Sequence, residues 1–238
     1  MENLKFLDFE PQRDAFDLGL LYNEVFSEPP WNEYTQCMSC RELFKKSTQQ
    51  GQICPKSACQ GELELAYPPQ ATVDYVLDDY AQRQAHVKVI RSNDILVAFS
   101  WGYPENVKDI IERKYSTEEM RLLLTGKLGE LGINDRIYYI SDCGVKKGFR
   151  GQGYSNLLVG SLFEEARRLR LGVVLRTVQE SPMILVARKF GMQQLLGPEI
   201  QLDEIKRSFV LNGNAVNNIW DLEDRRRLVF ANSPNQII

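Results

Sequence analysis

The sequence predicts an α/β fold, and three observations lead to this prediction. The chain has 238 residues, of which 43% are hydrophobic, and this is enough for a full core. Strand-like segments, with alternating or β-branched apolar residues, alternate along the chain with segments of helical periodicity. At residues 137–163, an apolar strand, a basic loop with glycines and an amphipathic helix are directly joined. We therefore expect residues 1–238 to form a single domain of this class.

The chain begins with a predicted strand and helix. Residues 3–10 alternate apolar and polar side chains, and a helix follows with Phe16, Leu20, Tyr22 and Phe26 at its apolar positions. The segment SEPPW ends this helix. Its Trp31 either forms the wall of a pocket or packs over the end of the helix, and the sequence does not distinguish these alternatives.

Four of the five cysteines form two close pairs, Cys37-x2-Cys40 and Cys54-x4-Cys59. A tetrahedral zinc ion needs four such ligands, and each pair supplies two thiolates from one tight turn. Two disulfides or four free thiols are the alternatives, and the lack of an export signal favours zinc. Four thiolates leave no open coordination position, so we expect a structural zinc in a zinc-ribbon-like insert at residues 33–66.

The remaining elements continue the alternation of helices and strands. A helix is predicted for residues 72–83, followed by the strands HVKVIR and ILVAFSWGY with a turn at residues 92–94. Helical patterning over residues 105–133 indicates an inserted helical segment. Residues 173–178 form a buried strand, and a helix begins near Ser181 and ends at Gly191. The segments MQQLL, SFVLN and RRLVFA are predicted to be strands.

The loop between residues 145 and 154 suits a pyrophosphate. Clustered glycines turn backbone N–H groups toward one point, and the N-terminus of the following helix adds its positive dipole end. The lysine-serine pair of a nucleotide-binding P-loop is missing. Taken alone, a short glycine motif could also be an ordinary tight connection.

The spacing of Arg150, Gly153 and Ser155 resembles the acetyl-CoA-binding motif Arg/Gln-x-x-Gly-x-Gly/Ala of the N-acetyltransferase (GNAT) superfamily. The resemblance implies a mixed, mostly antiparallel sheet that is flanked by helices and splayed between its fourth and fifth strands, where acetyl-CoA lies. Relative to this family, residues 105–133 are an insertion. The cofactor-binding residues implied by the resemblance are Cys143, Gly144, Val145, Arg150, Gly151, Gln152, Gly153, Tyr154 and Ser155.

The resemblance also implies a reaction, the direct attack of an acceptor amine on the thioester of acetyl-CoA. Asp142, close to the thioester strand, and Glu180 are candidate general bases, although each could equally be a solvated or capping carboxylate. Ala187 stands where many family members have a tyrosine that protonates the departing thiolate. The alternative function is therefore a degenerate domain that binds acyl-CoA and presents its zinc insert to a protein or nucleic-acid partner.

Charge and hydropathy narrow the range of partners. The net charge of −3 does not give the basic footprint of a nucleic-acid-binding protein. No run of 18 apolar residues is present, and the N-terminus lacks the pattern of a signal peptide, so we expect no membrane partner and a cytoplasmic location. The sequence leaves a homodimer open and does not identify the acceptor amine.

Overall fold

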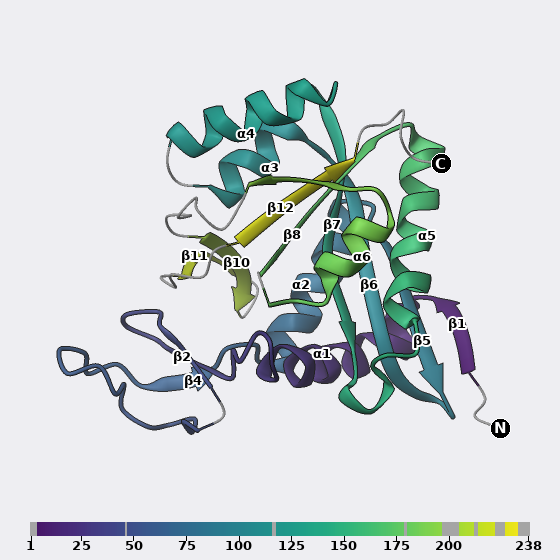
Figure 1. Ribbon diagram of the computed structural model, residues 1–238. Coiled ribbons are helices and arrows are strands. Elements are labelled where there is room, and N and C mark those ends of the chain that lie inside the picture. Colours follow the sequence, from purple (N-terminus) through teal and green to yellow (C-terminus); the bar gives the residue numbers. More distant parts are fainter. Residues whose placement is uncertain are drawn as a thin grey trace.

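The computed structural model describes residues 4–45, 47–115, 118–178, 180–196, 205–211, 214–221 and 227–232. Its centre is a seven-stranded sheet in the order β1-β5-β6-β7-β8-β12-β9 (Figure 1). Only the β7 and β8 pair is parallel, so the sheet is mixed and mostly antiparallel, as predicted. The strands are β1 (Leu4–Asp8), β5 (His86–Ser92), β6 (Ile95–Asn106), β7 (Arg136–Val145), β8 (Gly172–Val178), β9 (Gln193–Leu196) and β12 (Arg227–Asn232).

Helices cover both faces of this sheet (Figure 1). On what we call the first face, the helices pack against Phe99, Trp101 and Tyr139; they are α1 (Pro11–Ser27), α2 (Pro69–Gln82), α3 (Val107–Lys114) and α4 (Glu118–Glu130). On the second face, α5 (Tyr154–Leu169) and α6 (Met183–Lys189) pack against Tyr138 and Ile140. The two-residue alternation of β7 thus divides its side chains between two separate cores.

One extra residue in β7 changes this alternation. Asp142 is paired with Trp101 of β6, whereas the next partner of β6, Gly102, is paired with Ile140, so Ser141 is a bulge. Cross-strand partners place their side chains on the same face of a sheet. The bulge therefore turns Asp142 toward the first face, whereas regular alternation would have placed it beside Ile140 on the second.

The strands β7 and β8 diverge after a short parallel pairing. Residues 137–140 pair with residues 172–175, and beyond them the two strands no longer pair with each other. The end of β7 stays hydrogen-bonded to β6, while the end of β8 stays on β12. The sheet is thus splayed between its fourth and fifth strands, which the family resemblance predicted.

Two inserts extend from this framework. Between α1 and α2, the strands β2 (Thr35–Cys37), β3 (Leu43–Phe44) and β4 (Leu63–Leu65) form a small sheet that projects at the lower left of Figure 1. Between β6 and β7 lie the helices α3 and α4, within residues 105–133, where helical patterning was found in the sequence. A separate hairpin of β10 (Ile205–Leu211) and β11 (Asn214–Asp221) includes one strand that was not predicted. Within the described ranges, every helix is too short or too polar to cross a lipid bilayer.

Candidate functional site

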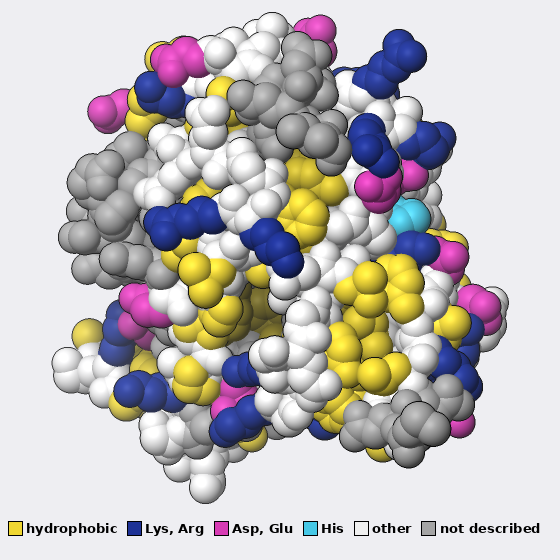
Figure 2. All heavy atoms as spheres, turned by 45° about the vertical axis from the view of Figure 1, so that its right-hand side comes forward, with side chains coloured by type: hydrophobic (Ala, Val, Ile, Leu, Met, Phe, Trp, Pro, Cys, Tyr) yellow, Lys and Arg dark blue, Asp and Glu magenta, His cyan; other side chains and the backbone are white. Residues whose placement is uncertain are grey.

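A cavity of about 720 Å³ opens where β7 and β8 diverge. Its walls come from α1, α2, the end of α3, both diverging strands, the loop before α5, and α6. Figure 2 shows a hollow on one face of the molecule, with hydrophobic side chains inside it and Lys and Arg side chains near its edge. The site is therefore assembled from segments far apart in the sequence.

Most residues predicted to bind the cofactor line this cavity. They are Cys143, Gly144, Val145, Arg150, Gly151, Gly153, Tyr154 and Ser155, whereas Gln152 is not among the lining residues. Gly151 and Gly153 have φ angles of +78° and +84°, a backbone conformation that glycine adopts without a steric penalty. These residues lead directly into the N-terminus of α5, whose first N–H groups lack partners within the helix. The loop thus has the geometry of an anion cradle.

The basic side chains of this loop hold it against α1. Lys146 and Lys147 form ion pairs with Glu24 and Glu28, at N–O distances of 2.6 and 3.6 Å. Arg150 donates hydrogen bonds to the backbone carbonyls of Val145 and Pro29 at 3.0 and 3.1 Å, and Pro29 lies in the loop that follows α1. These cations therefore position the loop, and the anion cradle itself depends mainly on backbone N–H groups.

The divergence also exposes polar groups inside the cavity. Residues 141–145 of β7 have no pairing with β8, so the backbone edge that faces the cavity is available to a ligand. On the opposite strand, Thr177 is buried, and its Oγ1 atom has no hydrogen-bond partner in the described parts of the chain. Burial raises the pKa of the Cys143 thiol to about 12, which keeps it protonated and excludes it as a nucleophile at neutral pH.

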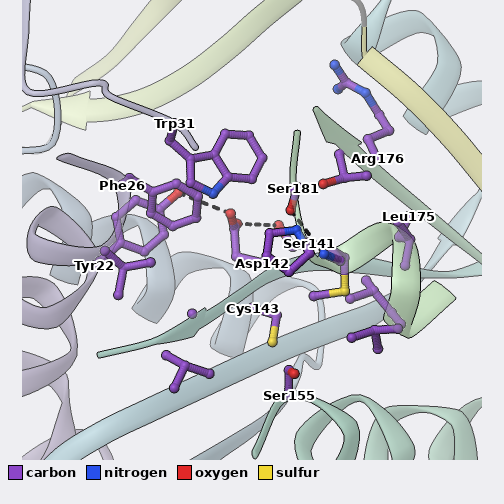
Figure 3. A pocket seen from close by; sticks show the side chains of 18 of the residues that line it. Tyr22, Phe26, Trp31, Ser141, Asp142, Cys143, Ser155, Leu175, Arg176 and Ser181 are labelled. Atoms are coloured by element: carbon purple, nitrogen blue, oxygen red, sulfur yellow. Dashed lines mark hydrogen bonds between the residues drawn. The ribbon is translucent and has the colours of Figure 1, made fainter. Parts of the chain in front are cut away.

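Asp142 is the central charged group of the cavity (Figure 3). Tyr22 Oη donates a hydrogen bond to its Oδ1 atom at 3.2 Å, and Ser141 Oγ donates to Oδ2 at 3.1 Å. Tyr75 extends this network, because its hydroxyl lies 3.0 Å from Ser141 Oγ. Burial raises the pKa of Asp142 to about 7 although nearby Lys114 opposes the shift. A carboxylate with this pKa is suited to general base catalysis at neutral pH.

The second candidate base is not in the cavity. Glu180 is exposed and is not among the residues that line the cavity, so the structure brings only Asp142 to this site. Ala187 is fully buried in the core between α5 and α6 and presents no polar group.

The aromatic residues of the first face form one wall. Trp31 lines the cavity, and its ring centroid lies 5.1 Å from that of Phe26 near the end of α1. Both interpretations of Trp31 are therefore correct. Trp101 is fully buried beneath the cavity, where its Nε1–H donates to Asp79 Oδ2 at 3.1 Å.

Several lining residues could not be predicted from the sequence, because no local motif marks them. Tyr75, Lys114 and Arg176 come from α2, the end of α3 and β8. Each of these segments was predicted as an element, but only the packing of the elements shows which side chains meet. Lys189 of α6 also lines the cavity and was not singled out.

The four clustered cysteines form a second candidate site in the small insert. Their Sγ atoms all lie within 4.8 Å of one another, and none forms a disulfide. The Cys37–Cys59 and Cys40–Cys54 Sγ distances are 3.5 and 3.7 Å. A tetrahedral zinc ion with Zn–S bonds of about 2.3 Å requires sulfurs about 3.8 Å apart. The arrangement therefore fits zinc in both ligand type and distance.

The sequence matches no known family model and no curated protein. Solved structures are similar to the chain over nearly its whole length. Polyamine N-acetyltransferase of Drosophila melanogaster, which forms N-acetylagmatine, has a TM-score of 0.52 at 11% identity and covers 96% of this chain and 99% of its own. Arabidopsis thaliana NAA60, solved with a bisubstrate analogue, has a TM-score of 0.50 at 10% identity and covers 97% and 98%. At such identities, the similarity establishes the shared fold.

Proposed function

The chain has the GNAT acetyltransferase fold, and from this premise we propose that it transfers an acetyl group from acetyl-CoA to an amine. One observation carries the proposal: the cavity at the split of β7 and β8 has a glycine-rich anion cradle and a hydrogen-bonded carboxylate in its walls. The cradle suits the pyrophosphate of the cosubstrate, and the carboxylate suits the proton of an acceptor amine.

The residues present fit acetyl-CoA. Backbone N–H groups around Gly151 and Gly153 would hold the pyrophosphate, and the unpaired edge of residues 141–145 would pair with the pantetheine amides. Thr177, whose buried hydroxyl has no partner among the described residues, offers one further hydrogen bond on the opposite strand. Acetyl-CoA supplies the activated acyl group as a thioester, and the backbone N–H groups of β7 would polarise its carbonyl.

Asp142 would prepare the acceptor for attack. An amine with a pKa of about 10 is neutral in only about one molecule in a thousand at pH 7, which is a barrier of about 4 kcal/mol. Asp142 would accept the proton from the ammonium group, while Tyr22 and Ser141 hold the carboxylate in place. With Ala187 at the position of the usual acid, CoA would leave as a thiolate, which is tolerable because the pKa of its thiol is about 8.5. The second proton that the nitrogen loses as the amide forms would pass to solvent.

A second candidate function is a domain that binds acyl-CoA without catalysis and uses its cysteine insert to bind a partner. The observation that favours it is Ala187, which places no acid at that position. The two functions differ in one property, the release of free CoA when an amine is present.

The test is an assay of CoA release from acetyl-CoA across a panel of small amines, amino acids and peptides. We expect acetyl-CoA to raise the melting temperature of the protein, and at least one amine to release CoA with acetylation of that amine. Stabilisation by acetyl-CoA without transfer to any amine would favour the binding domain. A melting temperature that acetyl-CoA leaves unchanged would contradict both functions.

We also propose that Cys37, Cys40, Cys54 and Cys59 hold a structural zinc ion. The apolar cluster around these cysteines contains only Leu63 and Phe44 among the described residues, so the insert has little core of its own. Zinc supplies about 10 to 16 kcal/mol of binding energy in comparable thiolate sites, which replaces the missing core. Metal analysis of the purified protein should find one zinc per chain, and a chain purified without chelator that holds no zinc would refute this site.

A further inference from the structure

Three charged residues lie on the first face of the sheet, around the split between β7 and β8. The bulge at Ser141 turns Asp142 to this face. On β8, Val174 is paired with Tyr139 and packs in the same core, so Arg176, two residues later, also points to the first face. Lys114 reaches this face from the end of α3, and all three charged residues line the cavity.

Lys114 forms no direct ion pair within the ranges that the structure describes, although Asp142 and Asp79 are near enough for their charges to act on it. Its Nζ atom lies 5.6 Å from the ring centroid of Tyr139, and no described carboxylate is within ion-pair distance. Burial lowers the pKa of Lys114 to about 7, and the charges of Arg176 and Arg113 add to this shift while those of Asp142 and Asp79 oppose it. A negative group bound here would therefore relieve an unfavourable arrangement of buried positive charge.

Arg176 is the second cation of the first face without an ion pair to a described residue. Its Cζ atom lies 5.2 Å from the ring centroid of Tyr115, and its buried Nε atom has no hydrogen-bond partner among the described residues. In Figure 3, Arg176 lies on one side of Asp142, and Trp31 and Phe26 lie on the other. Lys114 and Arg176 both adjoin Tyr139, so the two cations belong to one part of the cavity.

The other cations on this side of the cavity are already neutralised. Arg83 and Arg113 both form ion pairs with Glu105, and Arg83 forms a second ion pair with Asp79 at 3.0 Å. Among the cations that line the cavity on the first face, Lys114 and Arg176 are thus the two without an ion pair to a described residue.

We propose that the acceptor is an amine that also carries a carboxylate, with its amine at Asp142 and its carboxylate bound by Lys114 and Arg176. The free Nε–H of Arg176 and a neighbouring guanidinium N–H form the fork that binds a carboxylate through two hydrogen bonds. Lys114 adds a point charge to the same group. This inference rests on the proposed acetyl transfer and specifies its substrate class as amino acids or compounds of equivalent charge.

The test compares amines that differ only in the carboxylate, such as arginine with agmatine and lysine with cadaverine. We expect kcat/KM to be about 10- to 100-fold higher for the carboxylate-bearing member of a pair, the factor that corresponds to one hydrogen bond between charged groups. The variants Lys114→Met and Arg176→Leu should remove most of this preference, measured within each variant as the ratio of kcat/KM for the acid to kcat/KM for its decarboxylated amine. The ratio is the readout because Lys114 also lowers the pKa of Asp142, so its loss changes the rate with every amine.

Lys108→Met is the matched control. Lys108 lies on the same helix, its side chain is 80% exposed, and it forms an ion pair with Glu112 outside the cavity. This variant should keep the full preference. If agmatine and cadaverine react as well as the acids, or if Lys114→Met leaves the ratio unchanged, the inference is wrong. If acetyl-CoA binds but no carboxylate-bearing amine is acetylated, the inference is also wrong, although the cofactor site is retained. If acetyl-CoA does not bind, the proposed function itself is wrong.

Discussion

The substitution Asp142→Asn removes the proposed base with little change in shape. The amide can still accept the hydrogen bond that Tyr22 donates to Oδ1, so the side chain should keep its position. It can no longer accept a proton from the acceptor ammonium. A positioned base typically contributes about 10²- to 10⁴-fold, so we expect kcat to fall by this factor while the Kd for acetyl-CoA is unchanged.

The pH dependence gives a sharper test of the same residue. The carboxylate form of Asp142 is the active form, and its pKa is about 7, so kcat/KM of the wild type should rise with pH up to about 7 and then level off. Asp142→Asn should lack this rise. The assay is CoA release between about pH 5.5 and 9, with the acceptor kept well below its KM so that the rate reports kcat/KM.

The free energy of unfolding gives an independent measurement of the raised pKa of Asp142. The pKa of Asp142 is higher in the folded chain than its unfolded value of about 3.9, so protonation stabilises the fold at low pH. This contribution is lost as the pH rises from about 4 to about 7. The free energy of unfolding of Asp142→Asn should therefore exceed that of the wild type most clearly above pH 7.

Glu180→Gln is the control for both experiments, because Glu180 is exposed and does not line the cavity. It should leave the rate and its pH profile unchanged. The assignment of Asp142 is refuted if Asp142→Asn keeps the rate within about twofold, or if the rise near pH 7 persists in that variant.

Three further predictions concern the insert, the strand and the loop. Cys54→Ser should lose the bound zinc and lower the melting temperature, as measured by metal analysis and calorimetry. If removing the metal from the wild type left its melting temperature unchanged, this would count against the site. In Gly144→Ala, the new Cβ would lie 2.5 Å from Phe99 Cζ, so urea unfolding should show a loss of about 1 to 3 kcal/mol. Gly153→Ala must adopt a φ of +84° and should weaken acetyl-CoA binding through about 1 to 2 kcal/mol of strain, whereas Gly126→Ala, on an open face of α4, should not.

The parts of the fold that depend on local sequence could be predicted. The strand, loop and helix of residues 137–163 are consecutive, so periodicity and glycine spacing locate them. The four cysteines converge because each pair lies within a few residues, and two pairs are enough to define the cluster. The hairpin of β5 and β6 follows from Asn93 and Asp94, both of which adopt positive φ in its turn.

The charged side of the cavity could not be predicted, because it depends on how the elements pack. The bulge at Ser141 determines on which face of the sheet Asp142 lies, and no residue type in β7 predicts this bulge. Lys114 and Arg176 are ordinary surface residue types in sequence, yet they meet in the cavity because α3 covers the first face. Glu180 was a candidate from its position after β8, but the turn leaves it exposed.

The most direct test of the central claim is an isothermal titration of the purified chain with acetyl-CoA, with Gly153→Ala measured beside it. We predict that one acetyl-CoA binds per chain in the cavity between β7 and β8, and that the Gly153 variant binds more weakly. Absence of binding to the wild type, or equal affinity of the two proteins, would contradict a cofactor site built on this loop.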